Sequence, residues 1–190
     1  EVMTNKSPFD MICLGVSHIP ADRNVRGIVG DMSVADNLAM KGYRKAPLTE
    51  KGILHPKRIL ELANRMIDAF HIDTPTPQTH SKFLSGGNIQ KIILAREIDA
   101  CRGLLVAAYP SRGLDVSATE YVRNQIIEQS ESGKAVLLIS EDLEELMTVA
   151  DNIAVLYEGH IMGFLTCREA DTEKLGMLMA GIGENSKNIN

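Results

Sequence analysis

The chain has 190 residues, which is enough for one domain with a sizeable buried core. Its 20 basic and 25 acidic residues give a net charge of −5 at pH 7, which argues against a protein that binds nucleic acid through its overall charge. The sequence contains neither an apolar run of about 18 residues nor a secretion signal, so we expect no membrane span and no export.

The first part of the chain predicts short elements. The apolar run 11–19 predicts a buried strand, and residues 21–24 predict the loop after it. Residues 33–38 have the pattern of a capped helix start. Residues 41–55 contain glycines, a proline and charges of both signs without an apolar period, so they predict a mobile connector.

The middle of the chain predicts a long amphipathic helix. Pro56 suits the first turn of a helix, and apolar residues recur at spacings of three and four from Ile59 to Phe70. The Thr-Pro repeat at residues 74–77 then requires extended backbone, because a residue that precedes proline avoids helical dihedral angles.

The remaining segments predict a parallel sheet covered by helices. Continuous apolar runs at 104–108, 135–139 and 153–157 are typical of strands that are buried on both faces. The turn Glu158-Gly159 joins the third run to residues 160–165 and predicts a hairpin that ends the sheet. Helices are expected at residues 116–131, 142–150 and 169–180, and the polar tail 184–190 is expected to be disordered.

A distinctive segment, Leu-Ser-Gly-Gly-Asn-Ile-Gln-Lys at residues 84–91, precedes the helix-like run 92–100. A serine, two glycines and an amide side chain before an amphipathic helix predict an anion-binding helix N-terminus. The first helical turn leaves N–H donors unpaired and carries a partial positive charge. A phosphate-like group is the expected ligand of this helix N-terminus.

The order LSGGN-x-QK resembles the signature motif of ATP-binding cassette (ABC) ATPases, in the branch that serves importers of simple sugars and nucleosides. Residues 110–115 are similar to the loop after the Walker B strand of that family, and residues 18–23 to the region around its Q-loop. The resemblance extends from residue 19 to residue 181. It implies an α/β, partial P-loop NTPase fold with a mostly parallel sheet, flanking helices and a helical signature subdomain.

The resemblance also implies how the chain is divided. Residues 1–40 would form the Q-loop-like region and the entry to the helical subdomain, and residues 41–103 the helical subdomain with the signature. Residues 104–183 would form the second half of the ATPase core, followed by the tail 184–190. Importers of this branch carry two cassettes in tandem, and the sequence looks like the second, without its Walker A part; residues 175–181 lean toward the nucleoside branch.

In the family the signature acts in trans, on ATP held by the partner cassette. The resemblance implies that the Ser85 hydroxyl and the amides of Gly86 and Gly87 contact the γ-phosphate. Asn88 and Gln90 belong to the same nucleotide-binding set. A capped helix that needs no ligand is the alternative interpretation of this segment.

Asp115 matches the aspartate of the family's D-loop, which bridges the two cassettes. An acid that caps the helix beginning at Val116 explains the same residue equally well.

Hydrolysis also needs a phosphate cradle, a Mg²⁺ ligand and a group that orients water. The sequence contains no GxxxxGK[ST] motif. The Walker B aspartate and the catalytic glutamate of the family fall on Ala108 and Tyr109, which can neither bind Mg²⁺ nor orient water. The switch-histidine position falls on Glu141, which would repel a γ-phosphate and suits a helix start that Ser140 caps. Because Ala108, Tyr109 and Glu141 occupy the catalytic positions, we predict no catalytic residue and no metal site in this chain. Ala21 stands where related sequences have a polar Q-loop residue, so the resemblance does not imply coupling through this position.

The resemblance implies ATP and Mg²⁺ in the parent assembly and no cofactor for the isolated chain. The implied partners are a first cassette and permease subunits, with an extracytoplasmic binding protein acting indirectly and no nucleic acid. The location would be cytoplasmic, at the inner face of the membrane. One alternative is a non-catalytic regulatory or interaction module that retains the fold. A DNA-repair or chromosome-organising ATPase is another, but it would need long heptad repeats, which the sequence lacks.

The remaining candidate ligands are scattered. Cys13, Cys101 and Cys167 are odd in number and lack metal-binding spacing, so we expect buried thiols in a reducing compartment. The five histidines show no paired spacing for a metal.

Overall fold

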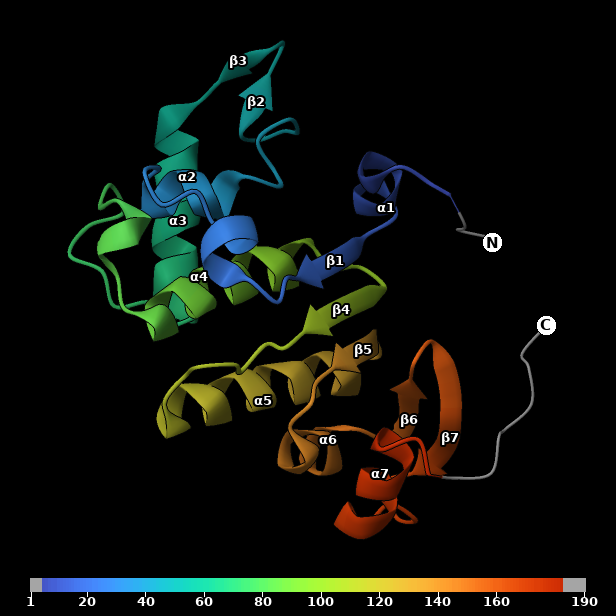
Figure 1. The fold of residues 1–190 in the computed structure, drawn as a ribbon. Coiled ribbons are helices and arrows are strands. Elements are labelled where there is room, and N and C mark those ends of the chain that lie inside the picture. Colours follow the sequence, from blue (N-terminus) through green and yellow to red (C-terminus); the bar gives the residue numbers. More distant parts are fainter. Residues whose placement is uncertain (1–4, 183–190) are drawn as a thin grey trace. The chain divides into compact units, whose positions relative to one another are not determined.

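The computed structural model describes residues 5–182, and these divide into two compact units with the break between Ile139 and Ser140. The break lies inside the predicted segment 104–183, and the subdomain boundaries expected after residues 40 and 103 stay predictions. The first unit contains α1 (Pro8–Cys13), β1 (Val16–Ile19), η1 (Arg23–Gly27), α2 (Val34–Ala39), β2 (Thr49–Glu50), β3 (Ile53–Leu54), α3 (Pro56–Ala69), η2 (Ser81–Phe83), α4 (Gly86–Ala100), β4 (Leu104–Ala108), α5 (Val116–Glu131) and β5 (Ala135–Ile139) (Figure 1).

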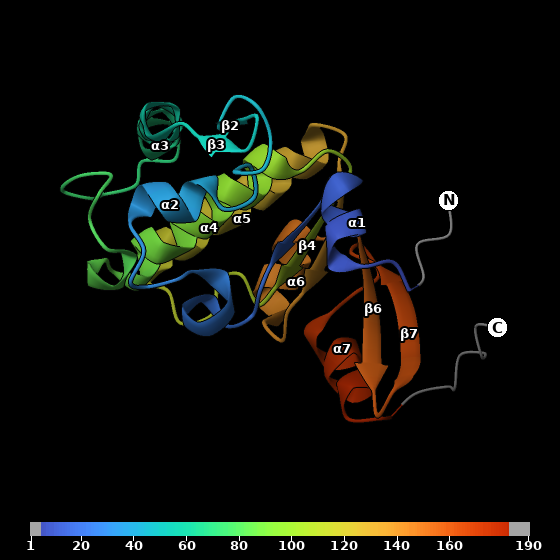
Figure 2. The same ribbon diagram turned by 90° about the horizontal axis from the view of Figure 1, so that it is seen from above.

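A three-stranded parallel sheet in the order β1-β4-β5 forms the centre of the first unit. Its carboxyl ends are level, because Ile19 pairs with Ala107 and Ala108 pairs with Ile139. Helices α4 and α5 run side by side along this sheet (Figure 2). The predicted parallel sheet with flanking helices is confirmed.

The outer strand β5 differs from the prediction of burial on both faces. Leu137 is 54% exposed and Ile139 is 42% exposed. Within the described residues β5 pairs only with β4, so the second edge of this strand carries no partner strand there.

The N-terminal strand is shorter than predicted. Residues 11–13 belong to α1, because Ser7 and Asp10 form a capping box in which the Ser7 hydroxyl accepts the Asp10 N–H at 3.2 Å. Gly15 then adopts a φ of +81°, which ends the helical segment before β1. The prediction of strand over residues 11–19 is therefore wrong for residues 11–15, because residues 11–13 are helical and residues 14 and 15 form the turn before β1.

Two further segments that were predicted as irregular contain regular structure. Residues 23 and 24 lie in the helical turn η1, because the Asp22 carboxylate accepts the N–H groups of Asn24 and Val25 at 3.1 and 3.0 Å. The connector 41–55 contains the short antiparallel pair β2–β3.

The long helix α3 is confirmed, and α2 lies against it. Asn37 of α2 is fully buried and connects the loop before this helix to the segment before α4. Its amide oxygen accepts the Val29 N–H at 2.9 Å, and its amide nitrogen donates to the Val29 carbonyl and to the Ser81 hydroxyl, both at 3.0 Å. Asn37 therefore acts as an internal cross-link between segments far apart in the sequence.

Replacement of Asn37 by alanine is expected to lower the free energy of unfolding by about 2 kcal/mol, because the buried partners lose their hydrogen bonds. Urea unfolding of the chain, followed by circular dichroism, measures this change. Asn24→Ala serves as the control, since Asn24 is exposed. Equal effects of the two substitutions would contradict the role assigned to Asn37.

The second unit contains α6 (Leu143–Val149), β6 (Asn152–Tyr157), β7 (His160–Thr166) and α7 (Thr172–Met179). The predicted hairpin is confirmed, with Glu158 and Gly159 both at positive φ in its turn. β6 pairs only with β7, so the expectation that residues 153–157 belong to the parallel sheet is wrong for the described structure. The core of this unit consists of Ile153, Val155, Met162, Leu175 and Leu178.

The last helix begins later than predicted, at Thr172, because the Asp171 carboxylate accepts the Lys174 N–H at 2.7 Å and caps it there. Glu169 lies before this helix and accepts hydrogen bonds from the Thr166 hydroxyl and N–H, which lower the pKa of the Glu169 carboxyl below its ordinary value. The predicted disordered tail 184–190 lies outside the described residues.

The cysteines differ from the expectation of three buried thiols. Cys101 is buried, whereas Cys13 is exposed at the end of the short helix α1 and Cys167 is half-buried. No helix within residues 5–182 combines the length and the apolar character needed to cross a lipid bilayer.

Candidate functional site

Ser85 lies at the N-cap of α4, and the helix begins at Gly86. The Ser85 hydroxyl accepts the backbone N–H and the side-chain N–H of Asn88 at 3.4 and 3.1 Å. Ser85 is exposed, and Gly86 and Gly87 are half-buried. The amide groups of the first helical turn are therefore close to a surface where a ligand or partner can approach.

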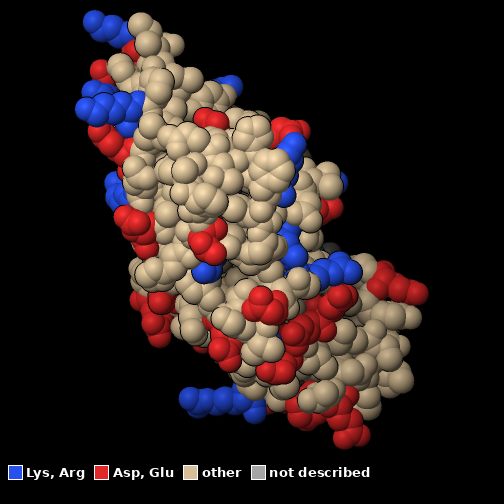
Figure 3. All heavy atoms as spheres, turned by 90° about the vertical axis from the view of Figure 1, so that its left-hand side faces the viewer, with Lys and Arg blue, Asp and Glu red and all other residues tan. Residues whose placement is uncertain are grey.

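Asn88 also holds the segment that follows α3. Its amide oxygen accepts the Asp73 N–H at 2.9 Å. A hollow of about 370 Å³ lies beside this contact, and its lining includes Pro75, Phe83 and Ser85. Phe83 is 73% exposed. In the space-filling view from the side of α3 and the segment before α4, uncharged side chains form a broad area with charged groups mostly around it (Figure 3).

Gln90 lies apart from this surface. It is only 2% exposed, and its amide nitrogen is buried without a hydrogen-bond partner in the described structure. The structure therefore does not bring Gln90 together with Ser85, and a contact between Gln90 and a nucleotide stays a prediction that the geometry does not favour.

A second helix N-terminus lies next to the first. The Asp115 carboxylate caps α5 by accepting the Ala118 N–H at 2.8 Å. A Cβ atom on Gly87 would lie 3.5 Å from the Cβ atom of Ala118, so the first turns of α4 and α5 are in contact. Val116 is 77% exposed beside this contact. The capping role of Asp115 is thus observed, and its role between two cassettes stays a prediction.

The ends of β4 and β5 carry the residues at the predicted catalytic positions. Ala108 ends β4, and Tyr109 follows it with a φ of +47°, an unfavourable backbone conformation for a bulky residue. The Tyr109 N–H donates to the Ile139 carbonyl at 2.7 Å, which holds this turn against β5. Neither an alanine nor a tyrosine side chain can supply the carboxylate that Mg²⁺ prefers as a ligand. No group of three potential metal ligands is present among residues 5–182.

Glu141 lies in the second unit, where it is exposed and precedes Asp142, the N-cap residue of α6. The helix is capped by Asp142, whose carboxylate accepts the Glu144 and Glu145 N–H groups at 2.9 and 3.2 Å. The prediction that Ser140 caps this helix is therefore wrong. The Ser140 hydroxyl accepts the Asp142 N–H at 3.1 Å and orders the approach to the cap.

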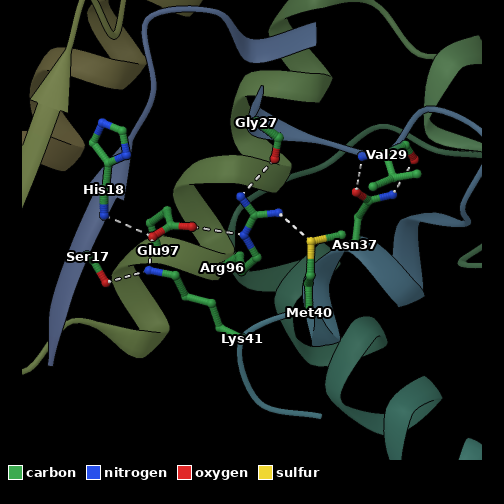
Figure 4. Close-up of polar contacts among 9 residues, drawn as sticks. All are labelled: Ser17, His18, Gly27, Val29, Asn37, Met40, Lys41, Arg96 and Glu97. Carbon is green, nitrogen blue, oxygen red and sulfur yellow. Dashed lines mark hydrogen bonds and ion pairs between the residues drawn. The ribbon is translucent and has the colours of Figure 1, made fainter. Parts of the chain in front are cut away.

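A buried charge network at the other end of α4 was not predicted from the sequence (Figure 4). The Glu97 carboxylate accepts the His18 N–H at 3.0 Å, pairs with the Lys41 ammonium and accepts Arg96 Nε at 2.9 Å. Arg96 donates in addition to the Gly27 carbonyl at 2.8 Å. The network joins α4 to β1, to the end of η1 and to the residues after α2. The charged pair inside the apolar run of α4 was the available sequence signal.

Comparison with known proteins gives matches along most of the chain. No model of a known protein family matches the chain. Guanosine import ATP-binding protein NupO of Bacillus subtilis is 44% identical over 177 residues, which cover 93% of this chain and 35% of that protein. Nucleoside import ATP-binding protein NupA of Lactococcus lactis is 39% identical, over 94% of this chain and 35% of that protein. Glucose import ATP-binding protein TsgD13 of Haloferax volcanii is 41% identical, over 96% and 34% respectively.

Solved structures agree with this relationship at the level of the fold. A nucleotide-free ATP-binding cassette from an ABC transporter superimposes with a TM-score of 0.71 at 17% identity, over 95% of this chain and 70% of that one. A dimeric ATP-binding cassette in a post-hydrolysis state with ADP and Pi gives a TM-score of 0.69 at 15% identity, over 86% and 69% respectively. The chain spans about a third of the length of the curated relatives it matches. The chain is therefore homologous to a segment of these import ATP-binding proteins that makes up about a third of their length, and it has the fold of an ABC ATPase.

Proposed function

We propose that this chain is part of the second cassette of an importer's ATPase. In this role it presents the Ser85 hydroxyl, the amides of Gly86 and Gly87, and Asn88 to ATP bound by a first cassette. The observation that carries the proposal is the exposed start of α4 at Ser85. Such a helix start attracts phosphate through its free N–H groups and its dipole.

A role in trans is favoured over catalysis within the chain by the residues at the end of β4. Ala108 and Tyr109 stand where hydrolysis needs carboxylates, so the chain has a phosphate-attracting helix start without the groups that activate water. The ATP and Mg²⁺ of the proposed assembly would accordingly be held by the first cassette.

The surface around Ser85 supports contact with another protein domain. Phe83 and Val116 are 73% and 77% exposed, and they lie at the helix starts capped by Ser85 and Asp115. Large exposed apolar side chains next to a polar site are typical of interaction surfaces. We propose that the first cassette covers this surface and that Asp115 lies at the contact.

The remaining partners follow from the homologous proteins, which are named for the import of guanosine, nucleosides and glucose. We propose that the parent protein works with permease subunits at the cytoplasmic face of the membrane, and indirectly with an extracytoplasmic binding protein. A nucleoside or a simple sugar is the proposed cargo. The signature site itself does not select it, because the site would contact only ATP.

Calorimetry of the isolated chain tests whether the first cassette, and not this chain, holds the ATP and Mg²⁺. Titration with Mg-ATP is expected to give no binding at micromolar concentrations, because Ala108 and Tyr109 provide no ligand for Mg²⁺ and one helix start alone holds a phosphate weakly. The control is the two-cassette protein, meaning the polypeptide or complex that contains this chain and the proposed first cassette, which is expected to bind. Micromolar affinity of the isolated chain would contradict the proposal.

A further inference from the structure

Arg23 is the first residue of η1, and its guanidinium reaches the loop between β4 and α5. Its Nη1 donates to the Arg112 carbonyl at 2.6 Å, and its Nη2 donates to the Gly113 carbonyl at 3.2 Å. This loop leads directly to Asp115. One planar group therefore fixes two successive carbonyls of the loop, which a single ammonium group cannot do with the same geometry.

The same guanidinium lies against the first residue of the signature helix. A Cβ atom on Gly86 would lie 3.2 Å from Arg23 Nη2 and 3.7 Å from Cζ and Nε. A Cβ atom on Gly113 would lie 3.7 Å from Nη2. Both glycines thus permit close contact with Arg23, which is inserted between the start of α4 and the loop before α5.

The electrostatic surroundings of Arg23 disfavour a cation, so a contribution to the stability of the fold does not by itself explain an arginine at this position. A cation near a helix N-terminus is opposed by the helix dipole. Among residues 5–182, no carboxylate lies within 4.0 Å of the Arg23 guanidinium to form an ion pair. Its Nε is buried without a hydrogen-bond partner in the same part of the chain. A neutral donor would satisfy the two carbonyls without this electrostatic disadvantage.

We propose that Arg23 is a positioning residue of the composite ATP site, which holds Ser85 and Asp115 in a fixed relation by clamping the start of α4 to the loop before α5. This inference rests on the proposed function in trans. Arg23 acts through Ser85 and not by touching the nucleotide. Its loss should therefore affect turnover more than the binding of ATP, because a small displacement of a group that acts in the transition state lowers kcat.

The test measures kcat and KM for ATP turnover in the two-cassette protein. Arg23→Ala is expected to lower kcat about tenfold and to change KM by less than about threefold. Arg23→Lys is expected to restore only part of the loss, since lysine lacks the two-pronged guanidinium. Arg26→Ala is the matched control, because Arg26 is an exposed arginine of the same helical turn and should leave kcat unchanged.

A double-mutant cycle with Ser85→Ala separates the two proposals. If Arg23 acts through Ser85, then Arg23→Ala should lower kcat by less than about threefold in the Ser85→Ala background. If Arg23→Ala lowers kcat equally in the wild-type and the Ser85→Ala backgrounds, Arg23 does not act through Ser85. If Arg23→Ala leaves kcat unchanged although Ser85→Ala lowers it, Arg23 has no positioning role. Either result would overturn the role of Arg23 and would not contradict the proposed function. No loss in Ser85→Ala would overturn both. Urea unfolding checks that each variant folds, and Arg23→Lys replaces Arg23→Ala if the latter does not.

Discussion

Replacement of Ser85 by arginine is expected to lower ATP turnover of the two-cassette protein by about 100-fold, which is the scale seen when a preorganised donor to a transition state is lost. The substitution removes the hydroxyl that caps α4 and places a long side chain beside the hollow next to Asn88. A phosphate approaching the helix start would then meet the new side chain before it reaches the amides of Gly86 and Gly87. Steady-state ATPase assays measure the effect.

The matched control is Ser130→Arg, which introduces the same side chain at an exposed serine in the last turns of α5. This variant should retain normal turnover, since a cation is favourable near a helix C-terminus and the site is at the other end of the helix. Normal turnover in Ser85→Arg would favour the alternative of an interaction module that keeps the fold without contacting ATP.

Replacement of Glu97 by glutamine is expected to lower the free energy of unfolding by about 3 kcal/mol. The Glu97 side chain is 2% exposed, and its carboxylate is the shared partner of the Lys41 ammonium and Arg96 Nε. A neutral amide would leave both cations without a counter-charge in the interior, which is far more costly than the loss of a surface ion pair. Urea unfolding followed by circular dichroism measures the change.

The comparison within the same helix is Asp99→Asn. Asp99 pairs with Arg65 at 3.7 Å, and the two side chains are 49% and 67% exposed. Because such an exposed pair contributes little, this substitution is expected to cost less than about 0.5 kcal/mol. Similar losses in the Glu97 and Asp99 variants would show that the buried network does not have the stabilising role assigned to it.

The sequence predicted those parts of the fold that depend on local pattern. The apolar period from Ile59 to Phe70 identified α3, and the turn Glu158-Gly159 identified the β6–β7 hairpin. Both depend on interactions between residues close in sequence. The signature segment was also predicted as a helix start, and Ser85 lies at that N-cap.

Errors occurred where a short polar contact outweighed an apolar pattern. Residues 11–13 look like part of a strand, but the Ser7–Asp10 capping box makes them helical. Asp22 similarly converts a predicted loop into η1 by accepting two backbone N–H groups. For β6, the apolar composition indicated a strand but contained no information about whether its partner would be parallel.

The polar connections of the candidate site were beyond prediction from local pattern. The Glu97 carboxylate bonds to His18, which is 79 residues away in the sequence, and Arg23 bonds to the carbonyl of Arg112, which is 89 residues away. Such pairs leave no periodic signal. The exposed setting of Asp115 and the buried setting of Gln90 likewise depend on how α4 and α5 pack.

The proposed site in trans requires that the Ser85 hydroxyl contacts the γ-phosphate of ATP held by another cassette. Vanadate trapped with ADP occupies the place of that phosphate, and ultraviolet light then cleaves the polypeptide at a serine in contact with it. We predict cleavage at Ser85 in the two-cassette protein when ATP, Mg²⁺ and vanadate are present, and no cleavage of the isolated chain under the same conditions. Two results would contradict this contact in trans. One is cleavage of the isolated chain at Ser85, and the other is a two-cassette protein that is cleaved elsewhere but not at Ser85.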